Sequence, residues 1–526
     1  MTDDAKAFDE PIDDYQAGDH SEERALEELR TKLADPMWRL NNIYKIKDKH
    51  GNVSVFKMNA AQENLFRNMH WRNVILKARQ LGFTTFIDLF MLDRCLFTPK
   101  DKPVRAGIIA HHMDDAKAIF DEKIKFPYEN LDPQIRAIIG ANTDARTEMK
   151  FSNNSTIRVS TSFRSGTLQY LHVSEFGKIA AKYPEKAKEI ITGAMEAVPL
   201  DGMIFVESTA EGRDGAFYKM TIEAKKMADM KKTLTHLDYK FFFYPWWKDP
   251  TYIMDPNGVT VTDEDISYFR DLEIQGIFLS DPQKAWWVKK YQQLGDEMFR
   301  ENPSYPEEAF KASLVGAYYG KTISNLRRQG RIGDVPHEAG WPVDTFWDLG
   351  MADATSIWFV QRVGRERRVL DYYSNSGEGI AHYANVLKEK DYVYGTHFMP
   401  HDIGVKELGT GKKRIDVAME LGIRPIYQVP RPKNTDQLLD QIEETRNFIA
   451  TCWFDERKCE AGDESGLSCL ENYRKEWDEK LGAFKRSPLH NWASHGADAF
   501  RSGAVGQQED DNYSEQEMDP EFAGDW

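Results

Sequence analysis

The stretch Lys77-Ala-Arg-Gln-Leu-Gly-Phe-Thr-Thr85 combines residue types that can bind phosphate. It follows the apolar run 74–76 and leads into the apolar run 86–92, which is the order of a strand, a loop and a helix. Gly82 and Thr84 stand where the phosphate-binding pattern G-x-x-x-x-G-K-[ST] has its second glycine and its hydroxyl. In that pattern backbone N–H groups at the helix start hold phosphates, and the hydroxyl serves Mg²⁺.

The lysine of this pattern is displaced in the chain. Phe83 occupies its position, whereas Lys77 occupies the position of the first glycine. A lysine stem of about four methylenes can reach back over the loop, so the positive charge is relocated rather than lost. An ordinary glycine turn before a helix is the alternative. We expect ATP and its Mg²⁺ to bind through Lys77, Gly82, Thr84 and Thr85, with Thr84 as a ligand of the ion.

A buried strand that ends in a carboxylate is expected at 168–176. Such strands in P-loop nucleotidases carry an Asp that helps to hold Mg²⁺, often followed by a Glu that polarises the attacking water. Ser174 stands in the Asp place and Glu175 in the Glu place. Because a serine reaches the ion only weakly or through water, metal binding must depend on Thr84 and the phosphates. Glu175 is the expected catalytic residue, and a surface carboxylate at a strand end is the alternative.

Other polar residues are candidates for nucleotide contacts. A further strand at 203–207 runs into a small polar turn, in which Ser208 and Thr209 are expected to sense the γ-phosphate. Gln62 offers an amide donor and acceptor that complement the edge of adenine. An ordinary turn and a solvated helical glutamine are the respective alternatives.

Two arginines are candidates for stabilising charge in the transition state of phosphoryl transfer. Arg79 lies within the loop, and Arg164 precedes the strand that ends at Glu175. In ring-shaped motors a neighbouring subunit often delivers such an arginine. A surface or phosphate-tracking role is the alternative for each.

The second half of the chain carries acids at intervals that suggest a second site. Strands are expected near 345–348, 355–361, 368–373 and 396–402, with a helix near 379–389 between the last two. A late helix is expected to begin near Ser494, the candidate N-cap residue. Three strands, a helix, a strand and a late helix are the order of a ribonuclease H-like fold.

That fold gathers acids from its first and fourth strands and its last helix around two divalent ions. Asp348, Asp402 and Asp498 hold these places. Two ions about 3.5–4 Å apart can activate water and stabilise the leaving oxygen in phosphodiester cleavage. Carboxylate oxygens suit Mg²⁺ or Mn²⁺. Asp353 and His495 are candidates for an outer ligand or a proton carrier, or have structural roles.

The net charge of −16 is concentrated at the ends of the chain. Residues 1–35 hold 12 acidic and 4 basic residues, and residues 506–526 hold 8 acidic residues and no basic one. The body between them is therefore neutral. Acidic ends of this composition are expected to be disordered, and either bind partners or only aid solubility. Basic residues near 406–414 are expected to hold DNA phosphates or to form a solvated surface.

Length and composition predict a multidomain protein of the cytoplasm. A chain of 526 residues is expected to form two or three domains. Its four cysteines lack C-x-x-C spacing, which argues against a zinc site or a disulfide framework. We find no signal peptide and no apolar run long enough to span a membrane. Aromatic residues and prolines are frequent at 226–335, which favours a small packed subdomain over a base-stacking surface.

Taken together, these motifs resemble the large subunit of tailed-bacteriophage terminase, the motor and nuclease that packages viral DNA. The resemblance covers roughly residues 36–505 and is most specific at the displaced-lysine loop, the strand ending at Glu175, the turn 208–212 and the helix carrying His495 and Asp498. It implies an acidic arm (1–35), a P-loop ATPase domain (36–225), a linker or lid subdomain (226–335), a ribonuclease H-like nuclease domain (336–505) and an acidic tail (506–526).

The resemblance also implies partners and a location. A terminase large subunit uses ATP and divalent ions to move double-stranded DNA into proheads and to cut concatemers. It works with a portal protein and a small terminase subunit, as a homo-oligomeric ring on the portal, in the host cytoplasm and outside the mature virion. A repair or recombination helicase-nuclease is one alternative. A degenerate ATPase that serves as a DNA-docking or assembly module is another, supported by Phe83 and Ser174.

Overall fold

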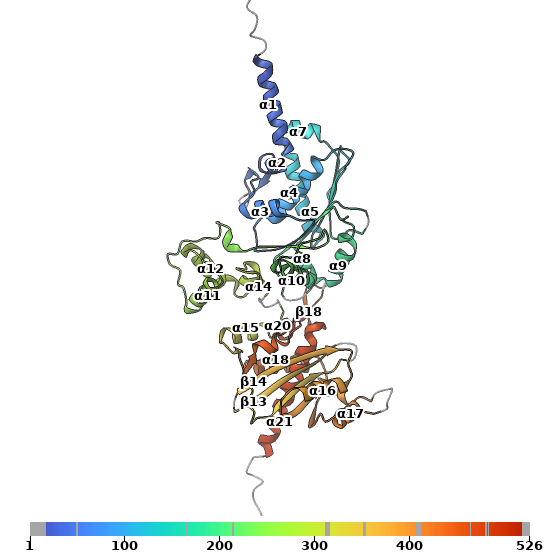
Figure 1. Cartoon of the computed structure of the whole chain (residues 1–526), viewed down its shortest axis with the longest axis vertical. Helices are drawn as coiled ribbons and strands as arrows, with labels where there is room; N and C mark the ends of the chain where they lie inside the picture. Colours follow the sequence, from blue (N-terminus) through green and yellow to red (C-terminus); the bar gives the residue numbers. More distant parts are fainter. Residues whose placement is uncertain are drawn as a thin grey trace, which may run out of the picture. The chain divides into compact units, whose positions relative to one another are not determined.

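The computed structural model describes residues 17–48, 51–164, 166–212, 215–310, 316–350, 354–364, 366–406, 412–462, 464–478, 481 and 483–517 (Figure 1). The chain forms two compact units. The first comprises residues up to 211 together with 215–309, and the second comprises 212–214 together with residues from 310 onward. Each unit has a central β-sheet.

The first unit is built on an eight-stranded sheet. In spatial order its strands are β10 (Lys240–Tyr244), β3 (Arg72–Lys77), β9 (Met203–Ser208), β8 (Tyr170–Ser174), β4 (Arg105–Ile109), β7 (Thr156–Ser160), β6 (Glu148–Phe151) and β5 (Ala141–Asp144). The six strands from β10 to β7 are parallel, and the remaining pairings are antiparallel. The carboxyl ends of β3, β9 and β8 therefore lie side by side. This is the parallel α/β architecture expected for a P-loop domain.

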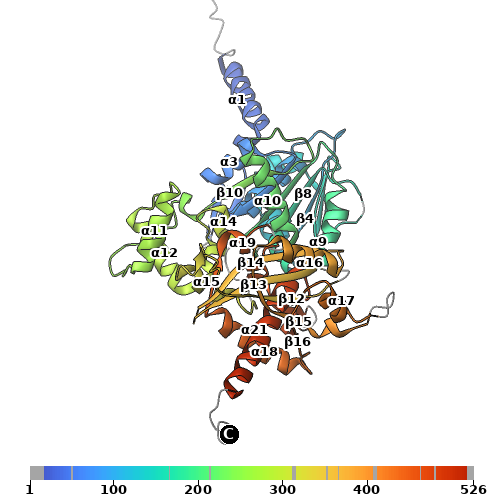
Figure 2. The same cartoon turned by 60° about the horizontal axis from the view of Figure 1, so that its bottom comes forward.

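Helices flank this sheet, and α10 lies against β10 and β3 (Figure 2). The helices of the unit are α1 (Ala17–Ala34), α2 (Pro36–Asn42), α3 (Ala60–Asn68), α4 (Phe83–Leu96), α5 (Met113–Ile119), α6 (Phe126–Glu129), α7 (Pro133–Ile138), α8 (Phe176–Lys182), α9 (Pro184–Glu189), α10 (Gly215–Asp229), α11 (Asp263–Ile274), α12 (Asp281–Leu294), α13 (Glu297–Glu301) and α14 (Pro306–Ala309). The π-helical turns η1 (Phe120–Lys125) and η2 (Ile190–Met195), the 3₁₀ turn η3 (Trp246–Lys248) and a hairpin of β1 (Lys45–Lys47) and β2 (Val53–Val55) complete it.

Hydrophobic burial fixes the two elements that carry the loop. All six residues of β3 are buried, as expected for a strand covered on both faces. Helix α4 is apolar along nearly its whole length and buries Phe83, Phe86 and Phe90. The Phe83 ring lies 4.5 Å from that of Tyr244 on β10. Phe83, at the usual lysine position, is therefore part of the hydrophobic core.

The segment expected as a separate linker at 226–335 is divided in the structure. Strand β10 pairs in parallel with β3, so it belongs to the first sheet. Helices α11 to α14 also belong to the first unit, whereas residues from 310 onward belong to the second. The aromatic side chains pack on one another: the Trp287 ring stacks on Tyr268 and Tyr291, at 4.2 and 4.9 Å between centroids.

The second unit is built on a seven-stranded sheet. In spatial order its strands are β11 (Ile332–Gly333), β17 (Cys452–Asp455), β14 (Glu366–Ser376), β13 (Ala354–Val363), β12 (Val343–Asp348), β15 (Tyr394–Pro400) and β16 (Ile426–Val429). Strands β12, β13 and β14 pair antiparallel, and β15 lies parallel between β12 and β16. This topology confirms the ribonuclease H-like strand order. A separate hairpin joins β18 (Lys475–Asp478) and β19 (Ala483–Pro488).

Each face of this sheet carries its own hydrophobic core. Phe346, Trp358 and Phe398 pack with residues of α18 and α21, whereas Trp347 and Ile357 pack with residues of α16 on the other face. The alternation follows from the two-residue period of a strand. The helices are α15 (Gly320–Arg328), α16 (Ile380–Glu389), α17 (Arg414–Glu420), α18 (Thr435–Ile449), α19 (Glu456–Cys459), α20 (Gly466–Asn472) and α21 (Trp492–Glu517), with the 3₁₀ turn η4 (His401–Gly404).

Helix α21 crosses the sheet at very close range. A Cβ atom added to Gly503 would lie 1.8 Å from Cγ of Phe346. The helix begins at Trp492, where the Asn491 side chain accepts a hydrogen bond from Ala493 N–H at 3.2 Å. The expectation of Ser494 as the N-cap is therefore wrong, because Ser494 lies inside the first turn and its hydroxyl donates to the Asn491 carbonyl at 2.6 Å.

The acidic ends are partly helical, in contrast to the expected disorder. Helix α1 covers 17–34, and α21 extends through 506–517. Within α1, Lys32 lies 2.6 Å from Glu28 one turn earlier, a spacing that supports helix. Residues 1–16 and 518–526 lie outside the described residues. None of the described helices combines the length and the apolar character needed to cross a membrane.

Candidate functional site

The loop between β3 and α4 has left-handed backbone at Gln80 and Gly82, whose φ angles are 61° and 75°. A Cβ atom at Gly82 would lie 2.7 Å from Nε2 of Gln62, so both conformation and space require glycine. Gln62 Nε2 donates to the Gly82 carbonyl at 2.9 Å, and its Oε1 accepts from Asn59 N–H at 3.0 Å. The Gln62 amide thus forms hydrogen bonds with the loop and with the residue that caps its own helix. Its contact with adenine stays a prediction.

Lys77 ends β3 with its amine between two carboxylates. Its Nζ lies 3.0 Å from Oε2 of Glu207 and 3.3 Å from Oε1 of Glu175. Burial alone lowers the pKa of Lys77, but Glu207 and Glu175 together raise it above its ordinary value. The side chain is therefore a buried cation at the start of the loop, close to the strand ends where phosphates are expected.

Glu175 directly follows β8 in a conformation that is rare for a side-chain-bearing residue. Its φ and ψ are 54° and 41°, in the left-handed region. Such strain persists only where the surroundings enforce it, and it is frequent at functional sites. Burial raises the pKa of Glu175, against the lowering effect of Lys77. The carboxylate is still 39% exposed, so water can reach it.

A carboxylate that sequence reasoning missed, Glu207, lies among these residues. Thr84 Oγ1 donates to Glu207 Oε1 at 2.7 Å, and Ser174 Oγ donates to the same atom at 2.9 Å. Burial would raise the pKa of Glu207, but Lys77 and His172 hold it below its ordinary value. The signal available in the sequence was an acid inside an otherwise apolar strand, which is costly unless the acid is paired.

A second ion pair lies behind Glu207. His172 Nδ1 is 2.7 Å from Oδ1 of Asp88, and His172 Nε2 is 3.5 Å from Oε1 of Glu207. All three side chains are fully buried. Burial lowers the pKa of His172, but Asp88 and Glu207 raise it to about 9. The imidazole is therefore a cation between two acids.

The remaining predicted nucleotide contacts have different surroundings. Thr85 follows Thr84 in the first turn of α4 and is half-buried. Ser208 ends β9 and Thr209 follows it; both are buried, and the Ser208 hydroxyl lacks a hydrogen-bond partner within the described part of the chain. A buried, unpaired hydroxyl beside the loop is suited to accept a ligand.

A chain of ion pairs connects the loop with the turn after β9. Arg79 Nη1 lies 3.0 Å from Glu301, and Arg300 Nη2 lies 3.0 Å from the same carboxyl group. Arg300 Nη1 in turn lies 2.6 Å from Glu211. The backbone N–H of Arg79 also donates to the Glu301 carbonyl at 2.8 Å. Helix α13 therefore joins the candidate phosphate loop to the turn after β9.

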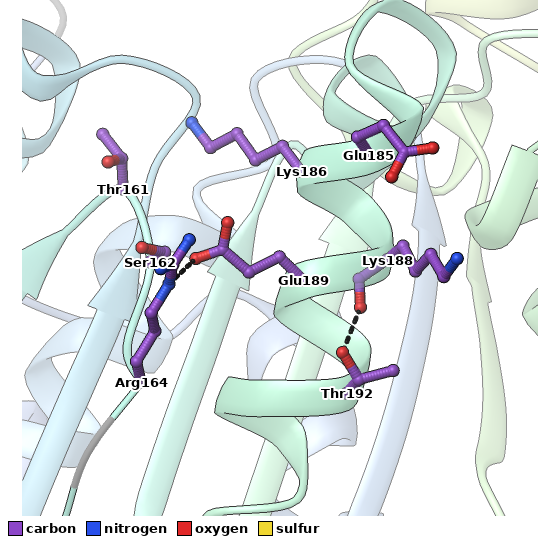
Figure 3. A pocket seen from close by; sticks show the side chains of 8 residues that line it. All are labelled: Thr161, Ser162, Arg164, Glu185, Lys186, Lys188, Glu189 and Thr192. Atoms are coloured by element: carbon purple, nitrogen blue, oxygen red, sulfur yellow. Dashed lines mark hydrogen bonds and ion pairs between the residues drawn. The ribbon is translucent and has the colours of Figure 1, made fainter.

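Arg164, the other arginine considered, lies at the edge of a surface hollow of about 570 Å³ (Figure 3). Its Nε is 2.7 Å from Oε1 of Glu189, and its side chain is 78% exposed. Lys186 and Lys188 line the same hollow. Both arginines are thus accessible and ion-paired, and neither is singled out as the one that stabilises transferred charge.

In the second unit, Asp348 and Asp498 approach each other at the end of β12. His495 Nδ1 lies 3.3 Å from Oδ2 of Asp348. Burial raises the pKa of Asp348, and the nearby charge of Asp498 raises it further against the lowering by His495. Asp498 accepts from the Tyr473 hydroxyl at 2.9 Å and from Arg501 Nη2 at 3.1 Å. Helix α21 therefore delivers both Asp498 and His495 to this strand end.

Asp402 is not gathered into the same group. It follows β15 within η4, at the sheet end where β12 also stops, because β15 runs parallel to β12. Its carboxylate is 51% exposed and lies 2.9 Å from His401 Nε2. Within the described ranges, no three His, Cys, Asp or Glu side chains are placed to hold a metal ion. Asp353 lies outside the described residues.

The basic residues near Asp402 are only partly described. Lys412 Nζ lies 2.8 Å from Glu420, and the backbones of Lys406 and Lys413 form a bridge. Residues 407–411 lie outside the description. Their contact with DNA stays a prediction. All four cysteines are free and buried, in agreement with the absence of a disulfide framework.

Comparison with known proteins gives likeness to solved structures alone. No protein-family model matches the chain, and no curated protein matches it. The structure is similar to the large terminase of bacteriophage HK97, with 12% identity over 90% of this chain and 99% of that one and a TM-score of 0.39. It is also similar to the large terminase of a thermophilic bacteriophage, with 12% identity over 85% and 99% of the two chains and a TM-score of 0.30.

A third likeness covers about half of the chain. The ATPase domain of the large terminase of Thermus phage P74-26 is 15% identical, over 48% of this chain and 94% of that domain, with a TM-score of 0.33. The strand order of each unit shows its fold independently of these likenesses.

Proposed function

We propose that this chain is the large subunit of a tailed-phage terminase, an ATPase that moves double-stranded DNA into proheads and a nuclease that cuts the concatemer. The main support is the meeting of Lys77, Thr84, Glu175 and Glu207 at the ends of three neighbouring parallel strands. The same chain carries a ribonuclease H-like sheet with two acids at the end of its first strand. The sequence motifs named above are typical of this family.

In the first unit each residue has a role in nucleotide hydrolysis. The loop N–H groups and Lys77 would hold phosphate oxygens, with Arg79 at the loop's exposed side. Thr84 and Glu207 would hold Mg²⁺, which supplies charge neutralisation to the phosphates when bound. Their fit rests on the buried Glu207 carboxylate, whose Oε1 accepts from Thr84 at 2.7 Å and whose Oε2 lies 3.0 Å from the Lys77 amine, a cation that bound phosphate would draw away. Glu175 would orient and polarise the attacking water.

In the second unit the donor set suits hard divalent cations only in part. Asp348 and Asp498 supply adjacent carboxylate oxygens, which Mg²⁺ and Mn²⁺ prefer. Asp402 would have to leave His401 to join them as the third acid of a two-ion site. His495, which already contacts Asp348, is placed to carry a proton or to orient that carboxylate. This arrangement supports a nuclease whose site is completed on binding DNA and ions.

The proposed function implies partners and a place. Double-stranded DNA, a portal protein and a small terminase subunit would bind the chain, and several copies would form a ring on the portal. The work would take place in the host cytoplasm, and the chain would leave before the virion matures.

Two other functions are compatible with some of the same features. A helicase-nuclease of repair would share both units, but we find no strand-separation motifs in the sequence. A degenerate ATPase used for docking would explain Phe83 and Ser174. Against it stand the buried Lys77 and the Glu207 carboxylate, which retain the charges that hydrolysis needs.

ATP hydrolysis with and without a purified portal separates these functions. A terminase should hydrolyse ATP slowly alone and faster when portal and double-stranded DNA are both present. A helicase-nuclease should respond to DNA but not to portal, and a docking module should show no hydrolysis under any condition. Absence of stimulation by the portal in an otherwise active enzyme would contradict the packaging role.

A further inference from the structure

Glu207 occupies the place that an aspartate of β8 would fill in a typical P-loop site. Strand β9 lies between β3 and β8, and the register sets Ser174 directly opposite Glu207. The Ser174 hydroxyl donates to Glu207 Oε1 at 2.9 Å, so the serine at the usual acid position contacts the acid on the neighbouring strand. The carboxylate is thus retained in space although it has moved in the sequence.

The contact with Thr84 gives Glu207 the partner expected of that acid. Thr84 Oγ1 is the donor in its 2.7 Å bond to Glu207 Oε1. A hydroxyl has one proton to donate and two lone pairs that accept. Because the proton points at Glu207, the lone pairs of Thr84 stay available for a cation at the start of α4. The hydroxyl and the carboxylate together form a set of hard oxygen ligands.

The charge balance of the site favours a cation at Glu207 when phosphate is bound. In the structure Lys77 lies 3.0 Å from Glu207 and supplies its nearest positive charge. Under the proposed function Lys77 turns to the phosphates. Glu207 is fully buried, and His172 is already paired with Asp88 at 2.7 Å. Once Lys77 has turned away, the buried carboxylate would keep two neutral hydroxyl donors and a histidine that it shares with Asp88, which favours a second cation in the place of Lys77.

We propose that Glu207 is the metal-holding carboxylate of the nucleotide site, in place of the missing strand-end aspartate at 174. The inference rests on the proposed nucleotide binding of this unit and deepens it. Ser174 and His172 are then positioning residues, which hold Glu207 through a hydrogen bond and an ion pair.

Binding of Mn²⁺ to the full chain with a non-hydrolysable ATP analogue tests this role without relying on turnover. Electron paramagnetic resonance measures the affinity for Mn²⁺, and a fluorescent ADP analogue measures nucleotide affinity in EDTA. Glu207→Gln keeps the size and the hydrogen-bond acceptor but removes the charge. It should weaken Mn²⁺ binding about 10- to 100-fold, whereas nucleotide affinity in EDTA should change less than about twofold.

Glu175→Gln is the matched control, because it removes the other carboxylate beside Lys77. It should leave Mn²⁺ affinity nearly unchanged. Unchanged Mn²⁺ affinity in Glu207→Gln, or equal losses in both variants, would overturn the assignment of Glu207 alone. If the wild-type chain binds no nucleotide with or without metal, the proposed function fails and the inference fails with it.

A swapped pair covers the case in which Glu207→Gln does not fold. The double variant Ser174→Asp with Glu207→Ser returns the acid to β8 and places the hydroxyl on β9, across the same register pair. Circular dichroism checks its folding. It should bind Mn²⁺ within about tenfold of the wild type. Ser174→Ala, a milder change, should weaken Mn²⁺ binding by a few-fold. The proposal would be overturned if the folded double variant bound Mn²⁺ more than about tenfold more weakly than the wild type and Ser174→Ala left Mn²⁺ binding unchanged.

Discussion

At the scale of single residues, the proposed nucleotide site depends on one lysine shared by two acids. Lys77 lies within 3.3 Å of both Glu175 and Glu207, and these acids stand at the ends of different strands. Any group that draws the lysine away changes the electrostatic surroundings of both acids at once. The proposed metal at Glu207 and the proposed water at Glu175 would therefore be linked to phosphate binding through a single side chain.

Replacing Lys77 with alanine should abolish ATP hydrolysis. The loop has phenylalanine where the usual lysine stands, so no second amine of the loop can neutralise the phosphates. Phosphate-release assays on the purified variant would measure this. Phe83→Leu is the control, since Phe83 is buried in the core and should affect stability rather than turnover. Normal hydrolysis by Lys77→Ala would show that the displaced-lysine interpretation is wrong.

The residue scale also shows where sequence reasoning stops. Lys77, Thr84 and Glu175 were predicted from their spacing, and in the structure Lys77 contacts Glu175 while Thr84 and Lys77 both contact Glu207. Glu207 was seen only as part of a strand, because its importance comes from pairing with Ser174 across a register that spacing does not reveal. A linear pattern finds an acid at its expected position, but not one that has moved to the neighbouring strand.

At the scale of elements, the short helix α13 connects the candidate phosphate loop with the turn after β9 through ion pairs. It lies outside the sheet, yet its Arg300 and Glu301 join the loop at Arg79 to the turn at Glu211. Sequence analysis predicted the strands that end at the candidate residues, since these follow apolar runs, but not β4 to β7 or the long helices α10, α12 and α18. The place of α13 and β10 in the first unit was missed, because membership of a unit depends on long-range contacts.

Arg300→Ala should destabilise the first unit and weaken its response to nucleotide. The change leaves Glu211, Glu297 and Glu301 without their shared, mostly buried cation. The loss should be about 1.5–3 kcal/mol in the free energy of unfolding, measured by urea denaturation. Lys225→Ala is the control: Lys225 pairs with Asp229 at a more exposed site, where screening should limit the loss to about 0.5 kcal/mol or less.

The second readout for Arg300→Ala is the effect of nucleotide on that stability. In the wild type, nucleotide bound at the loop should raise the midpoint of unfolding. If α13 transmits the state of the loop to the turn after β9, protease protection of that turn by nucleotide should be lost in the variant. Equal stability of Arg300→Ala and the wild type would contradict the structural role of the network.

At the scale of the whole molecule, the residues of the two proposed sites lie in separate compact units. The acids of the proposed nucleotide site belong to the first unit, and Asp348, Asp402 and Asp498 belong to the second. The strand order of the second unit was predictable, because it follows a regular succession of apolar runs, whereas the first unit was predicted only as a parallel sheet with three of its eight strands. The position of Asp402 apart from the other two acids was not predictable, since it depends on the 3₁₀ turn after the strand and on pairing with His401.

This separation predicts that each activity can be removed alone. Asp348→Ala should stop cleavage of plasmid DNA in Mn²⁺, because a two-ion site fails when a bridging carboxylate is lost. It should leave ATP hydrolysis intact. Glu175→Gln should stop ATP hydrolysis and leave DNA cleavage intact, and the full-length wild type in EDTA should show neither ATP hydrolysis nor DNA cleavage.

Asp402→Ala decides whether this half-exposed acid joins the site when DNA and ions are bound, since the variant should then lose DNA cleavage as well. Cleavage that persists in Asp348→Ala, in a preparation free of other nucleases, would contradict the nuclease site, whereas cleavage that persists only in Asp402→Ala would show that another residue provides the third ligand.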